Sequence, residues 1–168
     1  MSYDADITRH PHHTVHMTPE NVGTLFAALY ASHHVADHWI QTSRQACGKG
    51  DEGWRGRRAC AGHIAGHMFV SVACLLSLNI VNIHLTVNVM AIGLGIIAVT
   101  HYWIDRRAPL YRLAALLGHA GFITGCTVVR KSGDTPSETG PGTGLYALDQ
   151  SFHYLWLFIS ALTMVAIS

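Results

Sequence analysis

Long apolar runs alternate along this chain with short polar and basic segments. Residues 59–104 contain no Asp, Glu, Lys or Arg, and residues 145–168 contain one formal charge, at Asp149. A transmembrane helix needs about 20 consecutive apolar residues, so the first run is long enough for two crossings and the second for one. With an earlier apolar segment, the pattern predicts four membrane spans, at about 21–44, 59–79, 84–104 and 145–168.

The earliest of these spans is the least apolar, because it contains three histidines and Asp37. Its leucine, valine and aromatic residues still cover most of the helix surface, which favours a span. The alternative for this segment is an amphipathic helix that lies on the membrane face.

Composition supports a membrane protein. Hydrophobic residues make up 49% of the chain and charged residues 12%, and the mean hydropathy is +0.24. A soluble domain normally carries more charge on its surface. The net charge of +1 argues against a nucleic-acid partner. We therefore expect the lipid bilayer as the partner, and the sequence leaves the oligomeric state open.

The segment between the third and fourth spans is predicted to lie in the membrane plane. Its apolar residues follow the i, i+3, i+4, i+7 spacing of an interfacial helix over about 108–122. The alternative is a fifth span over 108–129. Gly, Pro, Ser and Thr then predict a loop over 130–144, and the polar residues 1–20 predict a disordered tail. The expected fold is all-α, a four-helix integral membrane bundle over 21–168 with an additional in-plane cytoplasmic helix.

Basic residues set the expected orientation. The chain has 11 Lys and Arg, and all except Arg9 fall in the two segments that follow the first and third spans. The positive-inside rule places those segments in the cytoplasm, so we expect a multi-pass protein of the cytoplasmic membrane with both termini outside. The four cysteines form no Cys-x-x-Cys pattern, and we expect free thiols.

Four pairs of His and Asp residues stand at helical spacing in or beside the predicted spans. Residues three or four apart share one face of a helix, and ionisable residues inside a membrane are costly and usually functional. In the predicted topology all four pairs lie near the cytoplasmic side. The pairs, with the Asp between the first two histidines, are His34, Asp37 and His38; His63 and His67; His101 and Asp105; and Asp149 and His153.

These nine residues are candidate metal ligands. Imidazole and carboxylate ligands suit zinc, iron or manganese, and nine candidates exceed what one ion needs. We expect one or two divalent ions, zinc first, with some of the nine orienting ligands instead. The alternative is a set of polar residues that hydrogen-bond between membrane helices.

Several neighbours of these pairs have weaker or auxiliary roles. Gln41 and Gln150 are expected beside the ligands, and Arg106 and Arg107 either anchor the topology or clamp a phosphate or lipid headgroup. His33 is expected to point toward the flank of the polar stripe and is a weaker candidate. His84, His119 and the histidines of the tail are expected outside the site.

The motifs resemble an uncharacterised family of small bacterial integral membrane proteins, known as a domain of unknown function. The family pattern matches His34, Asp37 and Gln41, then His63 and His67, then His101 and Asp105, and finally Asp149, Gln150 and His153, over residues 25 to 160. The resemblance implies the fold, the site and a bacterial membrane, without an activity. The in-membrane His/Asp pattern is also more loosely similar to bacterial membrane-bound metal-dependent hydrolases.

Three functions remain open from the sequence. The first is a metal-dependent hydrolase that acts on a lipid or lipid-linked phosphate ester at the cytoplasmic leaflet, with Asp37 orienting or deprotonating a water molecule. The second is a His-rich di-iron oxygenase or desaturase, although His-x-x-His-His triplets are missing and all three Glu lie in predicted loops. The third is a non-enzymatic metal-binding membrane subunit or carrier.

Overall fold

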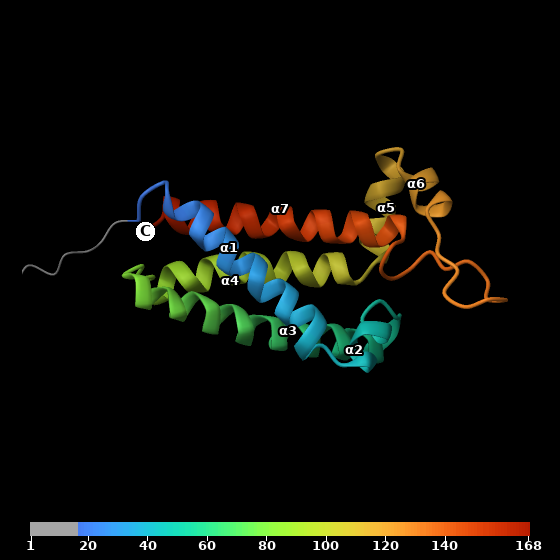
Figure 1. Cartoon of the computed structure of the whole chain (residues 1–168), viewed down its shortest axis with the longest axis horizontal. Coiled ribbons are helices and arrows are strands. Elements are labelled where there is room, and N and C mark those ends of the chain that lie inside the picture. Colours follow the sequence, from blue (N-terminus) through green and yellow to red (C-terminus); the bar gives the residue numbers. More distant parts are fainter. Residues whose placement is uncertain (1–16) are drawn as a thin grey trace, which may run out of the picture.

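Four long helices lie side by side in the computed structural model, which describes residues 17–168 (Figure 1). The described part is all-helical apart from loops and one isolated β-bridge. The expected tail over 1–20 lies outside the described residues except for its last four positions. The long helices are α1 (Asn21–Val35), α3 (Gly53–Ser77), α4 (Val87–Asp105) and α7 (Gly144–Ala166).

Helix α1 ends in a π-helical turn, η1 (Ala36–Ile40), where the Gln41 N–H donates to the carbonyl oxygen of Ala36 at 2.8 Å. Gln41 is extended, and the short helix α2 (Ser43–Gly48) follows, with a capping box formed by Thr42 and Gln45. The first long helix therefore stops before residue 44, where the span was expected to end. π-turns of this kind are frequent at functional sites.

The next two long helices form a hairpin. Helix α3 begins at Gly53, earlier than the expected 59, so three arginines belong to its first turns. It continues into the 3₁₀ turn η2 (Leu78–Val81), and Asn82 adopts a left-handed φ of 60° that ends the helix. The Thr86 hydroxyl accepts the Val89 N–H and caps α4.

Residues 108–125 do not form a single helix. They form α5 (Ala108–Leu116) and α6 (Ala120–Gly125), separated by Gly118 at φ +82°. Helices of nine and six residues are too short to cross a membrane. The fifth-span alternative is therefore wrong, and α4 ends at the same end of the bundle where α7 begins (Figure 1).

Two apolar cores enclose a polar layer. The larger core contains Leu25 and Leu29 of α1, Ile97 of α4 and Met164 of α7. The smaller core lies where α5 and α6 pack near Ile104. Most of the buried residues that belong to neither core are polar, among them His33, His63, His67, His101 and Asp105.

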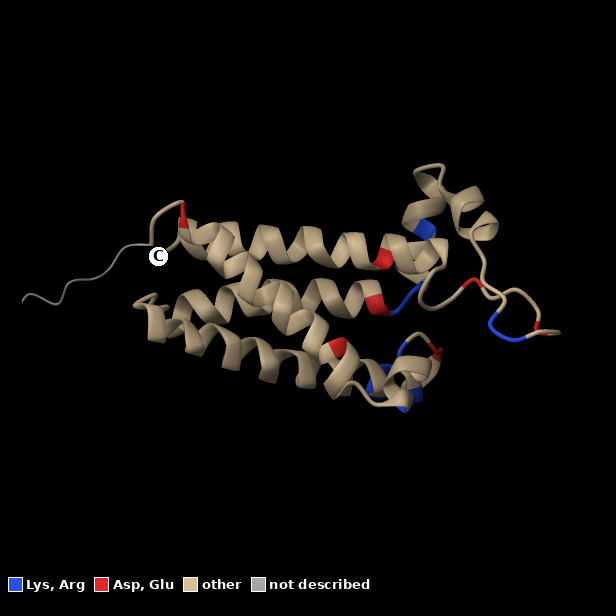
Figure 2. Ribbon diagram, viewed as in Figure 1, with Lys and Arg blue, Asp and Glu red and all other residues tan. Residues whose placement is uncertain are grey.

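Two helices are long and apolar enough to cross a membrane. The segment of residues 53–81 is 29 residues long and its most apolar 18-residue stretch has a mean hydropathy of 2.0, whereas α4 is 19 residues long with a corresponding value of 1.6. Their outer surfaces are apolar, and Phe69, Val87 and Val99 are each more than 70% exposed. The other two long helices do not meet both conditions. Among the described residues, Lys and Arg gather at the end of the bundle that carries α2, α5 and α6 (Figure 2).

Candidate metal centre

Three buried side chains from α3 and α4 form a compact triangle of ligating atoms. His63 Nε2 lies 3.0 Å from His101 Nε2 and 3.3 Å from Asp105 Oδ2, and His101 Nε2 lies 3.2 Å from the same oxygen. All three residues are at most 2% exposed. Ligand atoms about 2.0–2.1 Å from a tetrahedral zinc ion are roughly 3.3 Å apart. The triangle therefore has the size of one face of such a coordination sphere.

Buried polar atoms around the triangle lack hydrogen bonds within residues 17–168. These atoms are His33 Nε2, Asp37 Oδ1 and both carboxylate oxygens of Asp105. Neighbouring nitrogens lie close to them, as at the 3.2 Å between Asp37 Oδ1 and His63 Nε2, but not in hydrogen-bonding directions. Buried polar atoms are nearly always hydrogen-bonded. Asp105 Oδ1 lies 2.9 Å from the Lys49 ammonium, and a cation among the other three atoms would satisfy them. The buried His and Asp groups could hold a metal ion.

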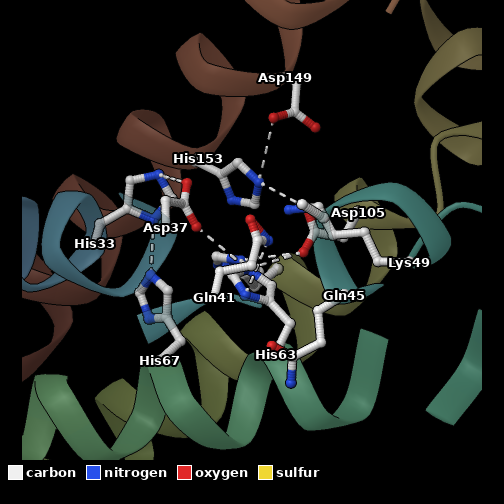
Figure 3. A network of polar contacts seen from close by, with 12 residues as sticks. His33, Asp37, Gln41, Gln45, Lys49, His63, His67, Asp105, Asp149 and His153 are labelled. Atoms are coloured by element: carbon white, nitrogen blue, oxygen red, sulfur yellow. Dashed lines mark hydrogen bonds and ion pairs between the residues drawn. The ribbon is translucent and has the colours of Figure 1, made fainter. Parts of the chain in front are cut away.

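A second group of possible ligands joins α1 to the triangle. Asp37 directs Oδ2 toward His33 Nε2 at 3.4 Å, and His33 Nδ1 lies 2.7 Å from His67 Nε2 (Figure 3). These three residues and His101 have ligand atoms close enough for one ion. Asp37 therefore connects the two groups through its two oxygens.

His33 is fully buried at the centre of the site, so its expected place on the flank is wrong. The expectation followed the polar residues of the first helix. The helix instead turns Leu25 and Leu29 inward, and His33 and Asp37 continue the same four-residue spacing. Residues four apart lie within about 40° of each other on a helix. The four-residue spacing from Leu25 through Leu29 to His33 is the sequence signal that would have predicted a buried His33.

His34 and His38, two of the nine candidate ligands, lie outside every group of converging ligand atoms. His34 Nε2 is 3.2 Å from the Tyr154 hydroxyl, and its ring packs against Tyr30. His38 is exposed. His34 therefore faces Tyr154 of α7, and His38 lies in η1.

A third group lies on the other side of Asp105. His153 Nε2 is 3.5 Å from Asp105 Oδ1 and 3.7 Å from Asp149 Oδ2. The structure thus brings together seven of the nine candidates, from four helical segments, as the paired spacing predicted. They are Asp37, His63, His67, His101, Asp105, Asp149 and His153.

The two glutamines lie beside these groups, as expected. The side-chain nitrogen of Gln41 is 3.3 Å from His63 Nδ1, so the opposite ring nitrogen faces His101. Gln150 donates to Asp149 at 3.2 Å and accepts from the Tyr154 hydroxyl at 3.0 Å. Contacts of this kind fix the orientation of ligating side chains.

The two arginines after Asp105 hold α2 and the turn between α2 and α3 against the end of α4. Arg106 donates to the carbonyl oxygens of Lys49 at 2.8 Å and Asp51 at 2.5 Å, and Arg107 donates to that of Ala46 at 3.2 Å. Arg107 adopts a φ of +57°, which is strained for a residue with a side chain. Both arginines therefore shape the site through backbone contacts.

Lys49 is a site residue that the sequence analysis missed. Its Nζ lies 2.9 Å from Asp105 Oδ1 (Figure 3). Burial alone would lower the pKa of Lys49, but the charges of Asp105 and Asp37 outweigh it and raise the pKa above 10.5. The side chain is therefore a permanent cation. Lys49 does not stand three or four residues from any paired residue, and the turn between α2 and α3 brings it to Asp105.

A cavity of about 360 Å³ reaches the polar layer from the end of the bundle that carries α2. Asp37 and Asp149 lie in its wall, beside the cations Lys49 and Arg107. The buried triangle lies behind them. The full lining is Asp37, His38, Gln41, Ala46, Lys49, Arg107, Gly140, Pro141, Leu145, Tyr146, Asp149 and Gln150.

The chain belongs to the family described as "Protein of unknown function (DUF3307)", whose model matches residues 25–168. The match covers α3, α4 and α7 in full, α1 from Leu25 onward, and every residue of the three groups. No curated protein and no solved structure matches the chain. The assignment to an uncharacterised family therefore agrees with the resemblance seen in the motifs, and functional arguments depend on the site itself.

Proposed function

We propose that this protein is a metal-dependent membrane hydrolase that acts on a phosphate ester of a lipid or lipid-linked substrate from the cytoplasmic leaflet. The observation that carries the proposal is the triangle of His63, His101 and Asp105 behind a cavity that contains two cations.

The distribution of polarity supports a place in the membrane. The inside of the bundle holds histidines and aspartates, whereas the outer faces of α3, α4 and α7 expose large apolar side chains. A soluble protein rarely exposes apolar surface on this scale. We infer four spans, formed by α1 with η1, α3, α4 and α7, with α2, α5 and α6 at the cytoplasmic side, where the basic residues gather.

The donor set supports zinc, with iron or manganese as alternatives. The triangle offers two imidazoles and one carboxylate, and the Asp37 oxygen near His63 is placed as a fourth donor or as a partner of a bound water. Lys49 already neutralises the other oxygen of Asp105. This arrangement favours one ion at the triangle over a pair of ions bridged by Asp105, and therefore hydrolysis over di-iron chemistry.

Asp37 has the position of a general base. One of its oxygens faces the triangle, its side chain is 11% exposed, and it lies in the cavity wall. It can take a proton from a water that approaches from the cavity and share that proton with His33, whose Nε2 lies 3.4 Å from Asp37 Oδ2. When bound, the ion would lower the pKa of that water and polarise the scissile oxygen.

The cations of the cavity fit an anionic substrate. Lys49 and Arg107 both lie in its wall, and a phosphoryl group is the anion that best matches an ammonium and a guanidinium together. The opening lies at the end of the bundle that we place at the headgroup level. A lipid phosphate could therefore enter without leaving the membrane surface.

The test measures phosphate release by the full-length protein in mixed micelles that contain phosphatidic acid or farnesyl diphosphate. The zinc-loaded protein should release phosphate from at least one, and chelation should stop it. Asp37→Asn should lower kcat by at least about 100-fold, the usual contribution of a general base, while bound zinc changes little. His84→Ala is the matched control, because His84 pairs with Asn79 in the distant α3–α4 turn.

Two results would contradict the proposal. One is release from neither substrate by the metal-loaded protein. The other is release that survives both chelation and Asp37→Asn. If Asp37→Asn instead empties the site of zinc, Asp37 is a ligand and the general-base assignment is wrong.

A further inference from the structure

A second cavity, lined by none of the residues of the first, lies on the outside of the bundle between α2 and the first turns of α3. It measures about 220 Å³, and three of its six lining residues are arginines. Its full lining is Thr42, Arg44, Gln45, Arg55, Arg58 and Ala59. Arg55 and Arg58 stand three residues apart on α3, so their side chains share a face, and Arg44 approaches from α2.

The wall of this basic cavity contains hydrogen-bond donors without acceptor partners. Within residues 17–168, Arg44, Arg55 and Arg58 make no hydrogen bond or ion pair, and no acidic residue lines the cavity. The side-chain oxygen of Gln45 accepts from Thr42 in the capping box, so its nitrogen remains free to donate. Three guanidinium groups and an amide therefore surround a space in which nothing balances their charge.

The surroundings of the cavity match the headgroup level of a bilayer. Trp54, in the first turn of α3, is 70% exposed, and Trp39 and Ile40, just before α2, are 84% and 46% exposed. Tryptophan is enriched at the membrane–water boundary, and helix α3 is one of the two helices apolar enough to span. The arginines thus stand at the level where lipid phosphates lie.

We propose that the basic cavity binds the phosphate group of an anionic phospholipid of the cytoplasmic leaflet. Arginine forks bind phosphate oxygens bidentately, and the exposed tryptophans lie beside the acyl chains of the same lipid. This site is separate from the metal centre and does not depend on the proposed hydrolysis. Its bound lipid holds α2 and the start of α3 in place, and with them the turn that carries Lys49.

Native mass spectrometry of the full-length protein in neutral detergent tests the proposal. Phosphatidylglycerol and phosphatidylcholine are titrated against the wild type, the triple variant R44Q/R55Q/R58Q and the control R57Q/R112Q/K131Q. The control removes the same charge from the same end of the bundle, but its residues lie outside the cavity. A chelator is present throughout, so the metal centre contributes nothing.

The wild type should bind phosphatidylglycerol at least about tenfold more tightly than phosphatidylcholine, since each surface cation contributes roughly fivefold. The triple variant should lose this preference and the control should keep it. Because the three arginines are exposed and unpaired, far-UV circular dichroism should show unchanged helix content. Single variants at Arg55 and Arg58 give the same comparison if the triple variant is unfolded.

Three outcomes would overturn the proposal. The first is an equal loss in the control, which would show diffuse attraction by the basic end of the bundle. The second is an unchanged preference in the triple variant. The third is displacement of phosphatidylglycerol by millimolar inorganic phosphate, which would identify free phosphate as the ligand.

Discussion

Replacing Asp105 by Asn tests the buried ion pair that Asp105 forms with Lys49 of the cavity wall. The two side chains have the same shape, so the change removes one negative charge with little effect on packing. Asp105 is fully buried, and its carboxylate lies 2.9 Å from the Lys49 ammonium. Neither Asp105 oxygen accepts a hydrogen bond within residues 17–168, so the main loss is the charged partner of Lys49.

The size of the effect follows from the burial of both groups. Breaking a buried ion pair by removing one partner costs about 3–5 kcal/mol. The side chain of Lys49 is 14% exposed and lies in the cavity wall, so water can reach the ammonium, and we expect the lower end, about 3 kcal/mol. Removing the ammonium as well, in the double variant Asp105→Asn with Lys49→Met, should recover about 2 kcal/mol of that loss.

The free energy of unfolding is measured by denaturant titration in mixed detergent micelles, with a chelator present so that metal binding does not contribute. The wild type, both single variants and the double variant complete a double-mutant cycle. A coupling energy below about 0.5 kcal/mol would refute the reasoning. Lys49 would then be solvated independently, and its raised pKa would not reflect a pair with Asp105.

Two further predictions concern the loop and the orientation. Gly56→Ala should lower the free energy of unfolding by about 1–3 kcal/mol in the same titration. The added Cβ would meet the Asp51 carbonyl oxygen and lie 2.8 Å from Arg106 Nη1. Unchanged stability would contradict this close approach. A cysteine is introduced at Ser137 and the four native cysteines are replaced by serine. This cysteine should react with an impermeant thiol reagent only after the cells are opened. Reaction in intact cells would contradict the cytoplasmic location of the 126–143 loop.

The long elements were predictable because each has a local signal. The lengths of the apolar runs predicted most boundaries of α3, α4 and α7 to within a few residues. The His/Asp spacing within each helix predicted that residues such as His63, His101 and Asp149 converge. The helix boundaries were less predictable. The break at Gln41 follows a π-turn, and the apolar pattern of 21–44 contains no sign of it.

The missed residues depend on contacts between distant segments. Lys49 reaches Asp105 because Arg106 and Arg107 hold the α2–α3 turn by its carbonyl oxygens. No pattern along the chain encodes those contacts. His33 is different, because its four-residue spacing from Leu29 is present in the sequence and places it on the buried face of α1, away from the polar stripe of His34 and His38.

The most direct test of the metal centre is the zinc content of purified His101→Ala and His34→Ala, compared with the wild type after zinc loading and desalting. The first residue belongs to the triangle, whereas the second lies on the same bundle outside every ligand group. Inductively coupled plasma mass spectrometry should find about one zinc per wild-type chain, the same in His34→Ala, and at least tenfold less in His101→Ala. A wild type that retains no zinc, or two variants that lose it equally, would contradict a metal site at His63, His101 and Asp105.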